Sequence, residues 1–600
     1  MSAAARRRLW LGALLLAWLV LWFAGAQSRS LLEPDEGRYA EVPRAMLASG
    51  DWVTPRFDGV LFFDKPALQY WATALAYAAF GIHNWTARLW SLLTGLLTLL
   101  AVGWTGARAF GRTAGWCAAA VLGSSLLWVV GSHLDTLDAG VAALLGMTLC
   151  AFILAQLPET TPRARRLWML LAWVLMAAAF LSKGLIGLAF PGGALFFYML
   201  WSGQWRLLRR MEWALGLPLF LLLVLPWLVE LQSRHAQFLD DFFVRQQFVR
   251  FLTDRDDRQR PFWFFPLLLV VGSFPWLALL PQALRMPARC DGFDARRLLW
   301  ILVLMILVFF SVSHSKLPLY LLPVFPAVAM LTGDAIARAS RRLLGAALGA
   351  AGLMLPVAIA LALRRQAPPD LLPLAGLFAD YMHRLAWAMG IAALLLALAA
   401  VLAWRGHRLA AAGVAAFTGL GLLQAALIGF QALAPAYSAQ PLARAMRPWL
   451  RPDAPVYMVD TLQRGLPFYL QRPVTLVGAV PYDLRDGLRW EPWRLLALPV
   501  FERRWRVQRD ALAVLSPARY ETLRAQGLPL RPVAHALHWV LVRHSAAADA
   551  RGMDNRASSV TPKAACPPAS WSAAPPSTAT ACSPASPSPP ARASSTTKAG

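Results

Sequence analysis

The sequence is poor in charged residues, which make up only 15% of its 600 positions. Soluble domains carry about 25%. Hydrophobic residues account for 58% of the chain, and basic residues outnumber acidic ones by 58 to 32. This composition excludes an ordinary soluble globular protein and indicates a membrane protein.

Cysteine and nucleotide-binding motifs are scarce as well. The five cysteines stand at positions 117, 150, 290, 566 and 582, outside the loops that we predict to be external. They therefore indicate neither a disulfide framework nor a cysteine metal site. No GxxxxGK[ST] sequence occurs, which argues against a pump driven by its own ATPase.

Long apolar runs recur up to about residue 432, and a helix needs about 20 such residues to cross a bilayer. We predict thirteen spans: 9–26, 88–107, 113–131, 138–157, 167–182, 184–202, 213–232, 263–281, 298–313, 318–337, 343–363, 384–404 and 409–432. The first run, which follows Arg6–Arg8, also resembles a cleavable signal peptide. We expect it to be retained, because its removal would leave the same external loops.

The arginines follow this topology. With a cytoplasmic N-terminus, every predicted inner loop carries at least two arginines, which satisfies the positive-inside rule. The net charge of +26 is therefore mainly topological, and nucleic acid is not an expected partner.

Three parts follow from these patterns. Residues 1–432 form the membrane body, with long external loops at 27–87 and 233–262. Residues 436–545 alternate β-type runs (APVYMVD, VTLV, ALAVLS, HWVLV) with helical stretches, which predicts a small external α/β domain. Residues 546–600 are rich in Pro, Ser and Ala and predict a disordered tail, or a frameshift product.

Lysine is rare, and its positions are informative. Only three lysines lie outside the tail: Lys65 in FFDKPALQYW, Lys183 in LSKGLIG and Lys316 in SHSKLPLYLLP. All three map to the external edge of the membrane, where a compact ammonium group suits a phosphate. Chance placement on one of two faces is the alternative.

Acidic residues map to the same edge. The clearest are Asp35 and Glu36 in EPDEGRYAEVPRAML, Asp64, and the pair Asp135 and Asp138 in GSHLDTLDAG. Ionisable groups at a membrane edge usually face a cavity, although a solvated loop position is the alternative for any single one. The cations could hold a phosphate, and a carboxylate could orient or deprotonate an acceptor. This combination predicts group transfer from a lipid-linked phosphate donor.

Two other classes compete with this prediction. A transporter of lipid-linked sugars would suit many spans, but the sequence shows no inverted repeat and no matching pair of broken helices. An inactive scaffold is the other.

The motifs of the first loop point to a family. DE-x-RYAE-x-PR-x-ML, SGDW-x-TPR and F-x-KP-x-L-x-YW resemble the first external loop of the bacterial aminoarabinose transferases, which are GT-C-type lipid-carrier-dependent glycosyltransferases related to the protein O-mannosyltransferases. The resemblance covers residues 1–330 well and the rest more loosely. It implies an α-helical polytopic membrane protein with about 13 transmembrane helices, interfacial helices in the first periplasmic loop and a small C-terminal α/β periplasmic domain.

The resemblance also assigns roles. Asp35 matches the essential carboxylate of the family, and Arg38 and Lys65 match cations near the donor phosphate. Asp138 matches an acid at the outer end of the fourth span, with Asp135 as a rival, and Tyr320 matches an aromatic residue near the carrier phosphate. Glu36 is a further catalytic candidate, and Lys183 and Lys316 are further candidates for the phosphate.

The implied activity is inverting transfer of 4-amino-4-deoxy-L-arabinose from undecaprenyl phosphate to lipid A, at the periplasmic face of the bacterial inner membrane. Such transfer masks negative charge and gives resistance to cationic peptides such as polymyxin. The alternative within the class moves mannose or another sugar to a protein or glycan.

Two departures from the family pattern bear on metal binding. Asp64 stands where family members often have Glu, and Gln246 and Gln247 precede Arg250 where they often have Glu-His. The family residues are candidate zinc ligands, and Gln is a poor substitute for an imidazole. The sequence therefore gives only weak support for a divalent metal, with Asp64 as the possible ligand that is left, and it indicates no other cofactor. Gln247 and Arg250 remain candidates for lining the cavity.

Overall fold

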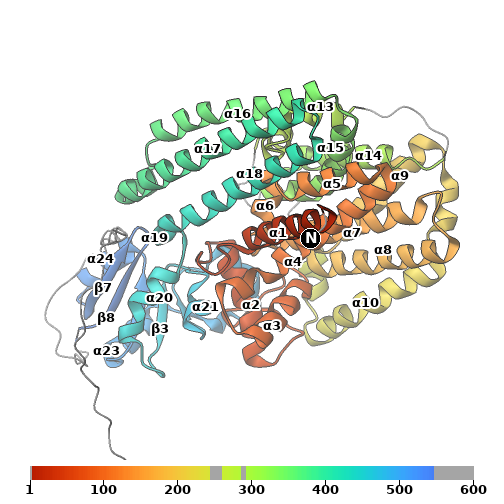
Figure 1. Ribbon diagram of the computed structural model, residues 1–600. Helices are drawn as coiled ribbons and strands as arrows, with labels where there is room; N and C mark the ends of the chain where they lie inside the picture. The colour runs from red at the N-terminus through yellow and green to blue at the C-terminus, as the bar shows by residue number, and fades with distance from the viewer. Residues whose placement is uncertain (1–2, 244–259, 286–291, 546–600) are drawn as a thin grey trace, which may run out of the picture. The chain divides into compact units, whose positions relative to one another are not determined.

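The computed structural model describes residues 3–243, 260–285 and 292–545 (Figure 1). The predictions for Gln247, Arg250 and the tail at 546–600 lie outside these residues.

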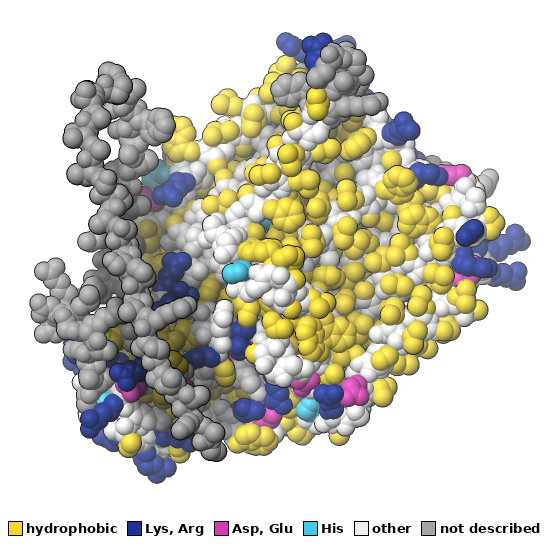
Figure 2. All heavy atoms as spheres, turned by 60° about the horizontal axis from the view of Figure 1, so that its bottom comes forward, with side chains coloured by type: hydrophobic (Ala, Val, Ile, Leu, Met, Phe, Trp, Pro, Cys, Tyr) yellow, Lys and Arg dark blue, Asp and Glu magenta, His cyan; other side chains and the backbone are white. Residues whose placement is uncertain are grey.

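Apolar helices make up the first three quarters of the described chain. They are α1 (Ala3–Phe23), α4 (Asn84–Phe110), α5 (Arg112–Leu122), α6 (Leu126–Ser132), α7 (Leu137–Gln156), α8 (Pro162–Lys183), α9 (Ile186–Ser202), α10 (Trp213–Arg234), α12 (Phe264–Gly272), α13 (Leu280–Ala283), α14 (Ala295–Val312), α15 (Phe325–Arg338), α16 (Arg341–Arg364), α17 (Ala375–Trp404) and α18 (Arg408–Gly429). Hydrophobic side chains cover the middle of the face drawn in Figure 2, and Lys and Arg side chains gather toward its edges. The chain is a multi-pass membrane protein.

Each of the thirteen predicted spans falls on one of these helices or on a bent pair of them. Within the described residues, nine helices are long and apolar enough to cross a membrane, or up to eleven if each bent pair is one span. The apolar helices Gly12–Phe23 and Ile186–Ser202 are shorter. The total of thirteen therefore stays a prediction.

The two bent pairs are a feature that the sequence reading missed. α5 and α6 meet at 63°, and α12 and the segment that includes α13 meet at 113°. The two breaks touch, since Leu126 N–H donates to Phe274 O (3.2 Å) and Trp276 Nε1 donates to Ser124 Oγ (2.9 Å). Pro275 lacks an N–H and cannot continue a helix, which accounts for the second break.

The first loop folds into two helices and a hairpin. These are α2 (Asp35–Ser49), β1 (Arg56–Phe57) paired antiparallel with β2 (Val60–Leu61), and α3 (Leu68–Phe80). Asp35 and Glu36 occupy the first turn of α2, where acids complement the helix dipole. The helix ends at Gly50, whose φ of 71° forms a left-handed cap and whose N–H donates to Met46 O. The sequence therefore places charge at the start of a short helix beside the bundle.

The C-terminal domain is a six-stranded mixed sheet in the order β5-β4-β3-β6-β8-β7. β3 is parallel to β4 and β6, and β8 is antiparallel to β6 and β7. The strands are β3 (Val456–Val459), β4 (Thr475–Val477), β5 (Leu495–Leu496), β6 (Leu512–Leu515), β7 (Leu530–Ala536) and β8 (Trp539–His544). The helices are α19 (Ala434–Tyr437), α20 (Gln440–Met446), α21 (Leu466–Leu470), α22 (Arg485–Trp490), α23 (Leu498–Val507) and α24 (Pro517–Ala525). The four strands predicted from sequence are confirmed, whereas β5 and β7 were not predicted.

The first loop and the α/β domain share one hydrophobic core. Tyr39, Val42 and Met46 of α2 belong to the same buried cluster as Leu466 of α21 and Leu484. The domain is therefore folded against the loop that carries the predicted catalytic residues.

Candidate active site

Asp35 and Arg38 lie on consecutive turns of α2 and form an ion pair between Asp35 Oδ1 and Arg38 Nη2. The Asp35 side chain is 46% exposed, whereas that of Arg38 is 12% exposed. Burial alone would lower the pKa of Arg38, but nearby Asp35, Asp483 and Asp64 raise it above its usual value. The site therefore joins an accessible carboxylate to a buried, permanently charged guanidinium.

Lys65 follows the hairpin and faces back to its neighbour. Its Nζ donates to the backbone carbonyl of Asp64 (2.8 Å) and lies 3.4 Å from Asp64 Oδ1. The side chain is largely buried, at 9% exposure. The charge of Asp64 helps to raise the pKa of Arg38, so the FFDKP motif and α2 contribute to one cluster.

A second cluster joins residues from three helices. Asp138 in the first turn of α7 forms an ion pair with Lys183, the last residue of α8. Lys183 Nζ lies 4.6 Å from the ring centroid of Tyr320 in the 3-10 helix η4 (Pro318–Val324), a cation–π distance. Three positions that the sequence predicted separately are thus brought together.

Lys316 lies in the turn before η4, and its Nζ donates to Ser313 O (2.5 Å). Tyr320, which follows it, packs against Phe310 with ring centroids 5.4 Å apart. Phe63 and Ala67 pack in a cluster with Phe180 near the end of α8, so the FFDKP segment lies against that end of the helix. All predicted phosphate-binding residues that the structure describes therefore belong to the same end of the helices.

Glu36 has a structural environment that differs from that of Asp35. It is 2% exposed and forms a two-armed ion pair with Arg88 at the start of α4, with both N–O distances 2.7 Å. It also accepts N–H groups from Leu32 and Asp135, each at 2.9 Å. Burial alone would raise the pKa of Glu36, but the nearby charge of Arg88 outweighs burial and lowers it. This geometry favours a role in holding the first loop on the bundle.

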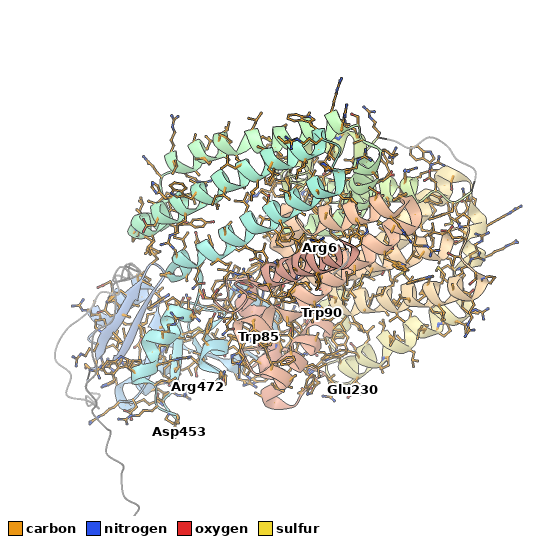
Figure 3. The ribbon with its side chains drawn as sticks, viewed as in Figure 1. Arg6, Trp85, Trp90, Glu230, Asp453 and Arg472 are labelled. Carbon is orange, nitrogen blue, oxygen red and sulfur yellow. The ribbon has the colours of Figure 1, made fainter. Side chains whose placement is uncertain are left out.

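Asp135 is buried beside this ion pair. Its Oδ1 accepts a hydrogen bond from Gln69 Nε2 (3.0 Å), and burial together with the charge of Glu36 raises its pKa well above the ordinary value. A Cβ on Gly140 would lie 2.5 Å from Nε1 of Trp90, labelled in Figure 3, and 3.1 Å from Gln69 Oε1. The glycine of TLDAG therefore allows α7 to approach α3 and α4. The raised pKa disfavours the charged form of Asp135, so Asp138 is the better candidate for a charged group.

Sequence reasoning missed three residues next to the site. Arg88 was placed at the edge of a span, where a buried cation is itself a functional signal. Asp483 and Arg464 come from the α/β domain and form a further ion pair with each other, and Asp483 Oδ1 lies 3.1 Å from Arg38 Nη1. Nothing in the sequence connects Arg38 to a residue 445 positions away.

Within the described part of the chain, no group of three or more His, Cys, Asp or Glu side chains is placed to hold a metal ion. Asp64 faces Lys65 and Arg38, which are cations and not ligands.

The fold and the site together define a class. A bundle of apolar helices, a charged first loop and a small α/β domain packed on that loop form a polytopic membrane protein with the GT-C fold. Comparison with known proteins gives the family.

Two family models match the chain. The Aminoarabinose transferase C-terminal domain matches residues 442–544, and Dolichyl-phosphate-mannose-protein mannosyltransferase matches residues 9–241. The crystal structure of ArnT from Cupriavidus metallidurans bound to undecaprenyl phosphate has a TM-score of 0.84 and 32% identity, over 90% of this chain and 98% of that one. Its apo state gives 0.83 and 33% over the same shares. The chain belongs to the aminoarabinose transferase family.

Curated relatives found by sequence comparison point to the same family. An undecaprenyl phosphate-alpha-4-amino-4-deoxy-L-arabinose arabinosyl transferase of Pseudomonas aeruginosa (strain UCBPP-PA14) is 34% identical over 56% of this chain and 61% of its own. A protein of the same name from Sodalis glossinidius, numbered 1, is 34% identical over 54% and 58%. The chain thus aligns with about three fifths of the length of these relatives.

Proposed function

We propose that the chain is an inverting glycosyltransferase that moves 4-amino-4-deoxy-L-arabinose from undecaprenyl phosphate to lipid A. The reaction takes place at the periplasmic face of the bacterial inner membrane and lowers the affinity of the surface for cationic peptides. The observation that carries the proposal is the accessible Asp35, paired with Arg38, at the end of the membrane bundle that also holds the pairs Lys65–Asp64 and Lys183–Asp138.

The chemistry is a single displacement at the anomeric carbon of the sugar. A bond forms from an acceptor oxygen to this carbon while its bond to the phosphate oxygen of the carrier breaks, and the bonding electrons leave with undecaprenyl phosphate. Lys65 and Lys183 stabilise the negative charge that grows on the leaving phosphate. Each lysine is held against an acid, so its ammonium group is oriented before the donor binds.

Asp35 orients the acceptor. A lipid A phosphate is already ionised at neutral pH, so it needs placement and not deprotonation. With a hydroxyl acceptor, the same carboxylate would take the proton as a general base. Its exposure lets an acceptor reach it, and Arg38 holds it from the buried side.

A second candidate is transfer of another sugar, or transfer to another acceptor. It is favoured by Asp64, which stands where family members often have Glu and lies beside Lys65. The same displacement serves both candidates.

The test is mass spectrometry of lipid A from a strain that lacks the gene. Complementation with the wild-type gene should restore an aminoarabinose adduct on a lipid A phosphate, and Asp35→Asn should not. Asp453→Asn is the matched control, since Asp453 is an exposed carboxylate of the α/β domain (Figure 3). Identical lipid A in the deletion and wild-type strains would refute lipid A as the acceptor.

A further inference from the structure

We infer that the C-terminal α/β domain completes the active site, because its Asp483 is a positioning residue that fixes Arg38 and, through Arg38, the catalytic carboxylate Asp35. This inference rests on the proposed function. It gives the domain a specific task in the transfer step.

The four side chains form one continuous line of alternating charge. Arg464 Nε contacts Asp483 Oδ2, Asp483 Oδ1 lies 3.1 Å from Arg38 Nη1, and Arg38 Nη2 contacts Asp35 Oδ1. Asp483 is 8% exposed and Arg38 is 12% exposed, so this part of the line is shielded from water. A shielded pair is screened much less than a surface pair.

The guanidinium geometry makes this arrangement directional. Arg38 presents its two terminal nitrogens in a rigid plane, so the position of one sets the position of the other. Asp483 binds Nη1 of Arg38, and this contact directs Nη2 of Arg38 toward Asp35. The rings of Tyr39 and Phe62 lie 5.0 and 6.0 Å from the guanidinium carbon and limit its remaining freedom.

Hydrogen bonds to the first loop hold the α/β domain in place on both sides of α2. Glu33, two residues before Asp35, accepts the N–H groups of Gly465 (2.6 Å) and Arg464 (3.2 Å). On the other side, Asp58 accepts the N–H of Val474 at 2.8 Å. These contacts anchor the loop on both sides of the helix that carries Arg38.

A further anchor comes from Glu491. It accepts from Arg56 Nη1 with both oxygens at 3.0 Å, and from Leu61 N–H at 3.0 Å. The hairpin of the first loop is thus fastened to the domain that supplies Asp483.

The charge balance distinguishes positioning from phosphate binding. Asp483 and Arg464 neutralise each other, so the domain adds no net negative charge beside a phosphate donor. Asp483→Asn removes one negative charge and leaves the cations in place. Affinity for the anionic donor should therefore stay the same or increase, while a misaimed Arg38 slows the chemical step.

The experiment is steady-state transfer by the purified full-length protein, with undecaprenyl-phosphate-linked aminoarabinose as donor and lipid A as acceptor. For Asp483→Asn we expect kcat to fall at least about 10-fold, since a misplacement of about 1 Å can cost about 100-fold. The donor KM should not rise. Asp483→Glu should recover part of kcat, and Arg464→Gln should lower kcat in the same direction.

The matched control is Asp510→Asn, which breaks an exposed ion pair with Arg451 (2.9 Å) in the same domain and should leave kcat unchanged. A wild-type kcat in Asp483→Asn would overturn the inference. So would a loss that comes with a higher donor KM and a lower melting temperature, because these mark a general structural role.

Hydrogen exchange gives a readout that does not depend on turnover. Asp483→Asn should speed exchange in residues 35–49, and Asp510→Asn should not. If the wild type transfers no sugar, the proposed function fails, while unchanged exchange at 35–49 would separately overturn the positioning role.

Discussion

Gly37 is the position where a single added methyl group should separate α2 from the α/β domain. It lies between Asp35 and Arg38 on α2, and its backbone packs against Gly465. A Cβ at this position would lie 2.6 Å from Gly465 N and 2.9 Å from Gly465 Cα. Ordinary contacts are about 3.5–4.0 Å, so Gly37→Ala must move the two backbones apart by about 1 Å.

The size of the effect follows from two opposing terms. Overpacking of this kind costs about 1–3 kcal/mol, while alanine gains about 1 kcal/mol over glycine inside a helix. The net loss of stability should be small. The same shift would stretch the Arg38–Asp483 contact from 3.1 Å beyond hydrogen-bonding distance. We therefore expect transfer to fall about 10- to 100-fold.

The assay compares sugar transfer and thermal melting in Gly37→Ala and a matched variant. Gly390→Ala introduces the same change in α17, where a Cβ would meet nothing within 4 Å, and should leave transfer unchanged. If the two variants transfer sugar at the same rate, the close approach of α2 to the domain does not govern activity and the reasoning is refuted.

Three further changes test other parts of the site. Arg88→Met leaves the buried Glu36 carboxylate without its partner, so we expect a loss of about 3–5 kcal/mol, seen as lower yield and melting temperature; unchanged melting would contradict this. Burial raises the pKa of Asp58 to about 8, so the folded chain holds a proton that the unfolded chain loses near pH 4, and stability should fall as pH rises between these values. Asp58→Asn keeps the acceptor for Val474 N–H and should melt higher than wild type above pH 8, with little difference at or below about pH 4; equal melting at both pH values would count against it. Lys183→Met removes the cation beside Asp138 and should raise the donor KM and lower kcat together by at least about 10-fold, which steady-state kinetics would show.

The sequence predicted the parts of this fold that depend on local pattern. Apolar runs located the helices of the bundle, and β-type runs located four of the six strands, because both signals lie within one segment. It missed β5, which has only two residues, and the helix breaks at Ser124 and Pro275, where a continuous apolar run hides a bend.

The site was predicted unevenly for the same reason. Motifs in the first loop singled out Asp35, Arg38 and Lys65. The scarcity of lysine singled out Lys183, which the structure places beside Asp138 and Tyr320. Asp483 could not be found, because its contact with Arg38 arises only from long-range packing between α2 and the α/β domain.

The most direct test of the account is transfer with purified components. Wild-type protein, undecaprenyl-phosphate-linked aminoarabinose and lipid A should yield free undecaprenyl phosphate and lipid A that carries the sugar, both detected by mass spectrometry. Asp35→Asn should lose about 100-fold of this rate, because the acceptor is no longer oriented, while it melts close to wild type. Absence of product with the wild type, or undiminished product with Asp35→Asn, would contradict the account.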